Sequence, residues 1–293
     1  MKRVLLTGAG GRGFIGRTLK EQMASKYDIF APPHKELDLC EAEDVKRYIA
    51  TNKIEAVVHA AVHVPSVNGQ SDEYLNDMKM FMNLERLCGE VDKIVYFGSG
   101  AEYDKRYDIT MATEEMIGNS MPVSEYGFAK YTMNAIARQS SNIYNLRLFG
   151  VFGKNEPWQV KFISTLCYKA VHQLPLTVRK DCAFDFLYVD DMMPVVDWVL
   201  ENSPAYHDYN LCSGTSHLLS EIAEMVKEMA EISEDILFLN EGRDLDYTGD
   251  NTRLKSDMPT FAPTPLPEAV EKLYRYICEN KHLVDYDTAK RVM

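Results

Sequence analysis

The sequence lacks the features that mark disulfide-rich, metal-binding and membrane-spanning proteins. Its six cysteines lie far apart and form no CxxC pair, which argues against a disulfide framework or a zinc site and favours reduced thiols. No run approaches the roughly 18 apolar residues of a membrane span. Glycines interrupt the apolar residues soon after Thr7, so we expect that this stretch is not a secretory leader. We therefore expect a soluble cytoplasmic protein without a metal site or a membrane partner.

Positive charge is also scarce. The chain has 32 Lys and Arg against 44 Asp and Glu, which gives a net charge of −12. A nucleic-acid-binding surface needs a basic stripe, so we expect no nucleic-acid partner. Local basic side chains and helix N-termini can still bind small anions. The length of 293 residues is enough for a large core and for one or two domains.

Glycine is concentrated in one stretch near the N-terminus. Residues 4–7 predict a buried parallel strand, and residues 14–21 predict a helix. A glycine-rich turn between them lets the backbone approach a pyrophosphate, whose charge is met at the start of the helix. This placement predicts a dinucleotide-binding turn, and an ordinary glycine-rich loop is the alternative. The glycines are Gly8, Gly10, Gly11, Gly13 and Gly16.

Apolar runs alternate with helical patterns through the first half of the chain, which predicts a parallel sheet covered by helices. From about residue 152 the pattern changes, and Ser220 is the expected N-cap of a helix at 220–231. We predict an α/β fold, a Rossmann doubly wound parallel sheet with a smaller C-terminal substrate-binding lobe. The first domain would cover 1–152 with 184–201 returning to it, and the lobe would cover 153–183 and 202–293. The expected strands are 27–31, 56–61, 93–97, 145–149 and 186–189, and the expected helices are 43–50, 124–139, 160–171, 192–200, 220–231 and 268–280.

Tyr126 and Lys130 lie four residues apart in a predicted helix, and therefore on one face of it. An ammonium beside a phenol stabilises the phenolate and lowers a pKa that starts at about 10. Such a tyrosine can exchange a proton with a substrate oxygen while a nicotinamide exchanges hydride with the carbon. A second pair of this spacing, Tyr286 and Lys290, is interpreted as incidental, because only Tyr126 lies in a helix that precedes a predicted sheet strand.

Ser99 follows the predicted strand 93–97, at the carboxyl end where parallel sheets bind ligands. Its hydroxyl is a candidate hydrogen-bond partner for the same substrate oxygen as Tyr126. The alternative interpretation is a turn serine between two glycines.

These motifs together resemble the extended short-chain dehydrogenase/reductases, the NAD(P)-dependent epimerase/dehydratase family. The resemblance spans residues 3–280 and implies a catalytic triad of Ser99, Tyr126 and Lys130. It also implies a nucleotide-sugar substrate and a homodimer in which the helix 124–139 is one of the pairing helices. The matching segments are 7–16, 99–103, 126–130, 146–149 with Gly153, and 185–191.

The resemblance places the cofactor on the glycine turn and favours NADP, with NAD possible. Residues 11–16 look like the turn of the GDP-fucose synthase branch, in which the arginine helps hold the 2′-phosphate. The predicted second strand ends without the carboxylate that binds the ribose in NAD-preferring members. His34 or Lys35 can meet a phosphate instead, unless these charges are simply solvated. The expected cofactor contacts are Gly8, Gly10, Gly11, Arg12, Gly13, Phe14, Ile15, Gly16, His34, Ala60, Ala61 and Lys130.

Departures from the family pattern reduce the number of reactions that we expect this chain to catalyse. Sugar dehydratases place an acidic pair where this chain has Gly100 and Ala101, and Glu102 comes one place late and should face the other way. Ala101 and Lys161 also stand where GDP-fucose synthase has its epimerising cysteine and histidine. We therefore expect the reduction of a sugar keto group, favouring a 4-keto-6-deoxy nucleotide sugar. The alternatives are an NAD-dependent nucleotide-sugar 4-epimerase and a non-catalytic NADP-binding sensor.

Substrate anchoring departs from the family as well. Two residues that lie near the diphosphate in many relatives are replaced here by Gly150 and Phe184. Either the diphosphate is held differently or the substrate is not a nucleotide sugar. The alternative interpretation is that the basic candidates below are solvated surface charges and that the histidine is structural. The candidate substrate contacts are His63, Gly100, Lys161 and Arg253.

Overall fold

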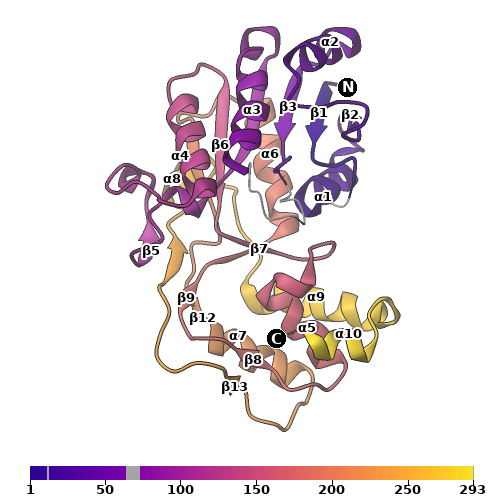
Figure 1. The fold of residues 1–293 in the computed structure, drawn as a ribbon, viewed down its shortest axis with the longest axis vertical. Helices are drawn as coiled ribbons and strands as arrows, with labels where there is room; N and C mark the ends of the chain where they lie inside the picture. The colour runs from indigo at the N-terminus through magenta and orange to yellow at the C-terminus, as the bar shows by residue number, and fades with distance from the viewer. Residues whose placement is uncertain (12, 64–72, 293) are drawn as a thin grey trace.

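A computed structural model describes residues 1–11, 13–63 and 73–292 of the chain. Figure 1 shows one lobe built on a central sheet and a second lobe made mostly of helices. Among the described residues, no helix combines the length and the apolar character that crossing a bilayer requires. The predicted α/β class, a Rossmann-like parallel sheet with a smaller lobe, is confirmed.

The central sheet has six strands in the order β11-β6-β4-β3-β1-β2, and every neighbouring pair is parallel. The chain passes from β1 to β2 on one side and then returns to place β3 on the other side of β1. Ligands of open α/β sheets bind in the crevice that such a reversal opens at the carboxyl ends of the strands. The strands are β1 (Arg3–Thr7), β2 (Asp28–Phe30), β3 (Ala56–His59), β4 (Lys93–Ser99), β6 (Ile143–Leu148) and β11 (Asp208–Leu211).

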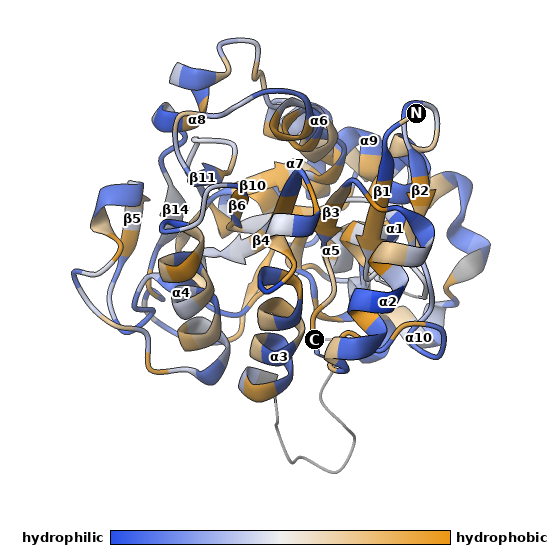
Figure 2. Ribbon diagram, turned by 90° about the horizontal axis from the view of Figure 1, so that it is seen from above, coloured by the Kyte–Doolittle hydropathy of each residue, from blue (hydrophilic) through white to orange (hydrophobic). Residues whose placement is uncertain are grey.

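Helices cover both faces of this sheet, which explains why its strands read as continuous apolar runs. Side chains alternate along each strand, so Val4 and Leu6 enter one core cluster and Leu5 enters the other. Figure 2 shows the hydrophobic colour concentrated in the central strands and on the helix sides that face them. The covering helices are α1 (Phe14–Met23) and α6 (Met192–Glu201) on one face, and α2 (Ala42–Asn52), α3 (Glu73–Glu85) and α4 (Glu125–Ala137) on the other.

The smaller lobe has its own core, formed mainly by three helices that pack together. These are α5 (Phe162–Val171), α7 (Leu219–Met229) and α9 (Leu266–Glu279), and α10 (Tyr286–Arg291) packs on α5. Two-stranded pairings join β7 (Gly150–Phe152) to β10 (Phe186–Tyr188) and β8 (Thr177–Val178) to β13 (Leu237–Phe238).

A four-stranded mixed sheet, in the order β12-β9-β14-β5, connects distant parts of the chain. It brings β5, from the first half of the chain, against β14, from the last fifth. Residues after β14 form the short helix α8 (Thr252–Asp257), which packs on β11. The strands are β5 (Ile109–Ala112), β9 (Ala183–Phe184), β12 (His217–Leu218) and β14 (Tyr247–Gly249).

Three local expectations are wrong. Strand β11 lies inside the range that we assigned to the smaller lobe, yet it pairs with β6 at the edge of the central sheet. The third strand ends at His59 rather than at residue 61. Ser220 is not an N-cap, because α7 begins at Leu219 and the Ser220 hydroxyl donates to Asp181 Oδ2 at 2.7 Å. The proposed domain boundaries otherwise stay a prediction.

Candidate active site

The glycine-rich turn joins β1 to α1 at the carboxyl edge of the sheet. Gly8 has a φ of +74°, a conformation that favours glycine, and a Cβ there would lie 2.6 Å from the Ala60 carbonyl. Cβ atoms on Gly13 or Gly16 would collide with the Gly8 carbonyl oxygen, whereas a Cβ on Gly11 would meet open space. Backbone packing therefore fixes this tight turn and leaves one of its glycines facing outward.

Thr7 and His59 join the ends of β1 and β3 beneath the turn. Thr7 Oγ1 lies 2.8 Å from His59 Nδ1 and accepts from the Ala61 N–H at 3.2 Å. Burial, together with the nearby Lys130 ammonium, lowers the pKa of His59 to about 3. The imidazole is therefore neutral at physiological pH. This arrangement holds Ala60 and Ala61 beside the glycine turn.

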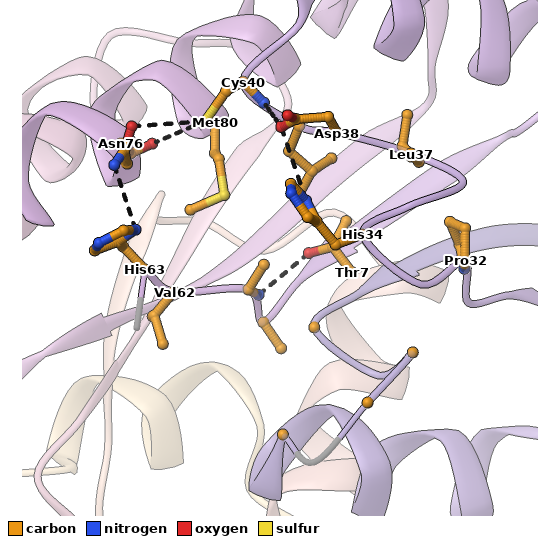
Figure 3. Close-up of a pocket in the computed structure, with 17 residues that line it drawn as sticks. Thr7, Pro32, His34, Leu37, Asp38, Cys40, Val62, His63, Asn76 and Met80 are labelled. Carbon is orange, nitrogen blue, oxygen red and sulfur yellow. Dashed lines mark hydrogen bonds and ion pairs between the residues drawn. The ribbon is translucent and has the colours of Figure 1, made fainter. Parts of the chain in front are cut away.

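A cavity of about 690 Å³ opens at this edge of the sheet (Figure 3). Its volume falls within the range of about 300–1,000 Å³ that is usual for small-molecule sites. The first residues of α1, Phe14, Ile15 and Gly16, are not among its lining residues, and Arg12 lies outside the described part of the chain. The lining includes these expected residues: Gly8, Gly10, Gly11, Gly13, His34, Ala60, Ala61 and His63.

The two histidines of the cavity have different surroundings, as Figure 3 shows. The His34 side chain is 81% exposed, and its Nδ1 lies 3.9 Å from Asp38 Oδ1. His63 is attached to α3, because its N–H donates to Asp77 at 2.7 Å and its Nδ1 lies 3.3 Å from Asn76 Nδ2. His34 is therefore an exposed side chain at the rim, whereas His63 has a structural contact.

Tyr126 and Lys130 lie on α4, which packs on β4 and on the residues that follow it. Lys130 is only 2% exposed, and its Nζ donates to the Phe97 carbonyl at 3.2 Å. The same Nζ lies 5.8 Å from the centre of the half-buried Tyr126 ring. The fold thus brings an ammonium and a phenol to the end of β4, where Ser99 is the last residue.

Ser99 is held by several neighbours. Its N–H donates to Glu102 Oε1 at 3.1 Å, and its Oγ accepts from the Ala101 N–H at 3.1 Å. The hydroxyl of Tyr247 lies against Gly100, the residue that follows Ser99. Tyr247 belongs to β14 and was missed in the sequence, because a single tyrosine in a three-residue strand carries no motif.

Glu102 is turned into the protein interior, although residues 100–102 form a short 3-10 helix and not the strand-like stretch from which we expected this orientation. Its Oε2 accepts from the fully buried Arg147 Nε at 2.7 Å, and its Oε1 accepts from Asn145 at 3.0 Å. Burial raises the pKa of Glu102, while Arg147 lowers it. Arg147 also contacts Asp208 at 3.0 Å. This carboxylate is therefore occupied in a buried ion pair behind Ser99.

The expected substrate contacts Gly100 and Lys161 lie in different settings. A Cβ on Gly100 would lie 2.5 Å from Tyr247 Oη, so only glycine fits beside this phenol. Lys161 is exposed at the start of α5, and its charge lowers the pKa of the neighbouring Lys105 after the larger effect of burial. Gly100 thus shapes the site through its lack of a side chain.

Arg253 has a different environment from the one we expected. Its Nη1 donates to Asp208 Oδ1 at 3.0 Å, its Nε lies 3.5 Å from Glu114, and Nη2 pairs with Glu115. Three carboxylates therefore surround this guanidinium beside β11. The pairing favours a structural role for Arg253 over a substrate contact.

Comparisons with known proteins agree with these features. Residues 4–212 match the NAD dependent epimerase/dehydratase family. GDP-L-colitose synthase of Yersinia pseudotuberculosis is 24% identical over 255 residues, covering 78% of this chain and 82% of that protein. The structure of a GDP-L-fucose synthetase from Naegleria fowleri bound to NADP has a TM-score of 0.81 at 19% identity. The match covers 99% of this chain and 95% of that chain. The structure of UDP-glucose 4-epimerase from Thermotoga maritima has a TM-score of 0.79 at 18% identity. The match covers 96% of this chain and 100% of that chain.

Proposed function

Because this chain belongs to the NAD dependent epimerase/dehydratase family, we propose that it reduces a keto group of a nucleotide sugar with NADPH. Membership makes it an NAD(P)-dependent enzyme of the extended short-chain dehydrogenase/reductase type. The favoured substrate is a 4-keto-6-deoxy nucleotide sugar. The observation that carries the proposal is the buried Lys130 ammonium beside Tyr126, at the end of the strand that bears Ser99.

The glycine turn and the cavity fit a dinucleotide. A tight turn leads into α1 at the strand reversal, and Gly11 leaves room for a ligand. No carboxylate stands at the end of β2, which is followed by Ala31 and two prolines. His34 lines the cavity, and its exposed imidazole can donate a hydrogen bond to a phosphate. These features favour NADP over NAD, and the bound cofactor would supply the hydride to the carbonyl carbon.

The residues of the chain would supply the proton. Tyr126 would donate its phenol proton to the carbonyl oxygen as the carbon receives the hydride, so that the ketone would be reduced to an alcohol at the expense of NADPH. Lys130 stabilises the phenolate that remains until solvent returns the proton. It would also contact the ribose of the bound cofactor, and Ser99 would donate a hydrogen bond to the substrate oxygen.

The surroundings of Ser99 support reduction over elimination of water. Elimination needs a second acid or base beside the tyrosine. Gly100 and Ala101 have no ionisable side chain, and the Glu102 carboxylate is bound to Arg147. The same Ala101 leaves no thiol with which to epimerise the ring. The described residues around Ser99 therefore suit hydride and proton transfer alone.

A nucleotide screen followed by a turnover assay tests the function. Thermal shifts are measured with UDP, GDP, dTDP and ADP in the presence of NADPH, because a bound nucleotide stabilises the fold. NADPH oxidation is then followed with the 4-keto-6-deoxy sugar of the nucleotide that binds. We expect turnover that depends on NADPH. Protein that purifies with NAD and consumes no NADPH would instead indicate a 4-epimerase.

We also propose a homodimer that pairs α4, with the adjacent α3, against the same helices of a second copy. In one chain α3 and α4 pack side by side, and Leu75 on α3 is 49% exposed. Light scattering on the purified protein tests this, with Leu75→Glu expected to shift the mass from that of two chains to that of one.

A further inference from the structure

Lys105 places an ammonium on the ring of Tyr247, beside the candidate catalytic serine. Its Nζ is 4.3 Å from the centre of the ring. The hydroxyl of the same ring reaches the site, since a Cβ on Gly100, the residue after Ser99, would lie 2.5 Å from Tyr247 Oη. Tyr247 is only 6% exposed, whereas Lys105 is exposed. A ligand in solution can therefore reach an ammonium that lies one phenol ring away from Gly100.

The residues on either side of Lys105 hold its segment of the chain in place. Arg106 Nη2 donates to Asp104 Oδ2 at 2.6 Å, and Arg106 Nε donates to Asp104 Oδ1 at 2.9 Å. Ser120 Oγ donates to the same Asp104 Oδ2 at 2.6 Å. The neighbouring carboxylate is therefore engaged by other groups. Within the residues that the structure describes, Lys105 forms no ion pair.

A second ammonium lies near the first and comes from the other lobe. Lys161 is exposed at the start of α5. Although Lys105 is exposed at the surface, partial burial lowers its pKa, and the charge of Lys161 acts in the same direction. Two cations that repel each other are both stabilised by an anion placed between them. The pair therefore favours a ligand with negative charge over a neutral sugar.

We propose that Lys105 binds the diphosphate of the nucleotide-sugar substrate, with Lys161 as the second positive charge. This inference deepens the proposed function and rests on it. In a 4-keto sugar the keto oxygen and the diphosphate lie at opposite ends of a ring that is about as wide as a phenol. A sugar whose keto oxygen contacts Ser99 can therefore extend along Tyr247 and present its phosphates to the ammonium. The three N–H groups of the lysine suit several phosphate oxygens.

This role differs from that of Lys130. Reduction at the keto carbon leaves the charge of the diphosphate unchanged, so Lys105 would bind the substrate and the transition state equally. Such an interaction lowers KM and leaves kcat almost unaffected. The loss of Lys105 should therefore raise KM, whereas the loss of Lys130 should lower kcat.

Binding measurements on variants test the assignment without turnover. The probes are GDP, UDP, dTDP and ADP, each beside its own nucleoside, and saturating NADPH fills the cofactor cavity. Calorimetry gives the dissociation constants. For the diphosphate that binds best to the unmodified protein, Lys105→Met should weaken binding by about 10- to 100-fold, because a charge-assisted hydrogen bond is lost. The affinity for the nucleoside should stay the same.

Two further variants separate the charge from the position of the lysine. Lys105→Arg keeps the positive charge and should retain most of the diphosphate affinity. Lys290→Met removes an exposed ammonium from α10 and should retain all of it. Equal diphosphate affinities in Lys105→Met and the unmodified protein would overturn the inference, as would a failure of all four diphosphates to bind.

Turnover distinguishes the failure of this inference from the failure of the proposed reaction. The assay follows NADPH oxidation with the 4-keto-6-deoxy sugar of the nucleotide that binds. Oxidation with an unchanged KM in Lys105→Met would leave the reaction in place and overturn the binding role of Lys105. Diphosphate binding that depends on Lys105, without NADPH oxidation, would support the binding role and count only against the reaction.

Discussion

Two Tyr–Lys pairs of identical spacing have almost the same geometry and very different surroundings. The ammonium lies 5.8 Å from the ring centre in Tyr126–Lys130 and 5.9 Å in Tyr286–Lys290. Lys130 is buried and bonded to a strand carbonyl, whereas Tyr286 is 47% exposed and Lys290 is exposed. Four-residue spacing on a helix therefore sets the distance, and burial decides how strongly the charge acts, since water screens an exposed ammonium.

The helices that carry the two pairs explain this difference. Ser124 is the N-cap of α4, and its Oγ accepts from the Gly127 N–H at 3.1 Å. The helix packs on β4, which ends at Ser99. Helix α10 packs on α5 in the smaller lobe, where the Tyr286 ring meets His172 edge-on at 6.2 Å. One pair lies at the carboxyl edge of the parallel sheet, and the other lies on a lobe surface. The second pair is therefore a natural control for the first.

The largest effect is expected from the phenol itself. Tyr126→Phe should lower turnover by about a thousandfold, because the proton donor is lost, while the affinity for NADPH stays the same. Tyr286→Phe should leave turnover unchanged. Steady-state kinetics and a fluorescence titration of NADPH measure the two quantities. Full activity in Tyr126→Phe would refute the proposed mechanism.

The buried ion pair between Glu102 and Arg147 extends the comparison to stability, because an exposed ion pair is available as its counterpart. Glu102→Gln leaves the buried Arg147 short of a charge partner and should lower the free energy of unfolding by about 3 kcal/mol. Glu271→Gln removes the exposed pair with Arg275, joined at 2.7 Å, and should cost less than about 1 kcal/mol. Urea denaturation compares the variants. Equal losses would mean that burial does not distinguish these pairs.

The ammonium groups give the next comparison. Lys130→Met removes the charge beside Tyr126 and the bond to the Phe97 carbonyl, and should lower kcat by about a hundredfold. Lys290→Met is the matched control, because it removes an exposed ammonium with the same four-residue spacing from a tyrosine. It should leave kcat unaltered. Both variants are assayed under NADPH saturation, because Lys130 also contacts the ribose in our proposal. Similar kcat values for the two variants would show that the location of the lysine in the fold does not determine its effect on turnover.

A pH-dependent effect on stability is expected from His59, which lies near the buried Lys130 ammonium. The pKa of His59 is lowered from 6.5 in the unfolded chain to about 3 in the folded chain. Between these two pH values the unfolded chain therefore binds a proton that the folded chain does not bind. The stabilisation is complete above pH 6.5 and is lost as the pH falls toward 3, by about 1.4 kcal/mol per unit. His59→Asn should flatten this slope in urea titrations between pH 6.5 and 4. An unchanged slope would assign the acid sensitivity to other groups.

Local patterns predicted what local forces determine. The apolar run before Gly8, the four-residue spacing of Tyr126 and Lys130 and the strand before Ser99 all appear as the sequence indicates. The catalytic assignments stay predictions until variants are measured.

Long-range pairing explains what the sequence could not show. Tyr247 reaches Gly100 only because β14 pairs with β5 and β9. Arg253 meets its carboxylates only because α8 packs on β11. Ser220 prefers the distant Asp181 to the cap of its own helix. Such contacts depend on the register of strands far apart in the chain.

The late edge strand β11 limits how this enzyme can be recombined with its relatives. A chimera that joins a foreign lobe after residue 152 would discard residues 208–211, and the N–H and C=O groups of β6 would lose their partner. Such an unprotected edge invites association with other chains. A workable exchange would therefore retain β11 and α8 from this protein, replacing only the helices around the second core.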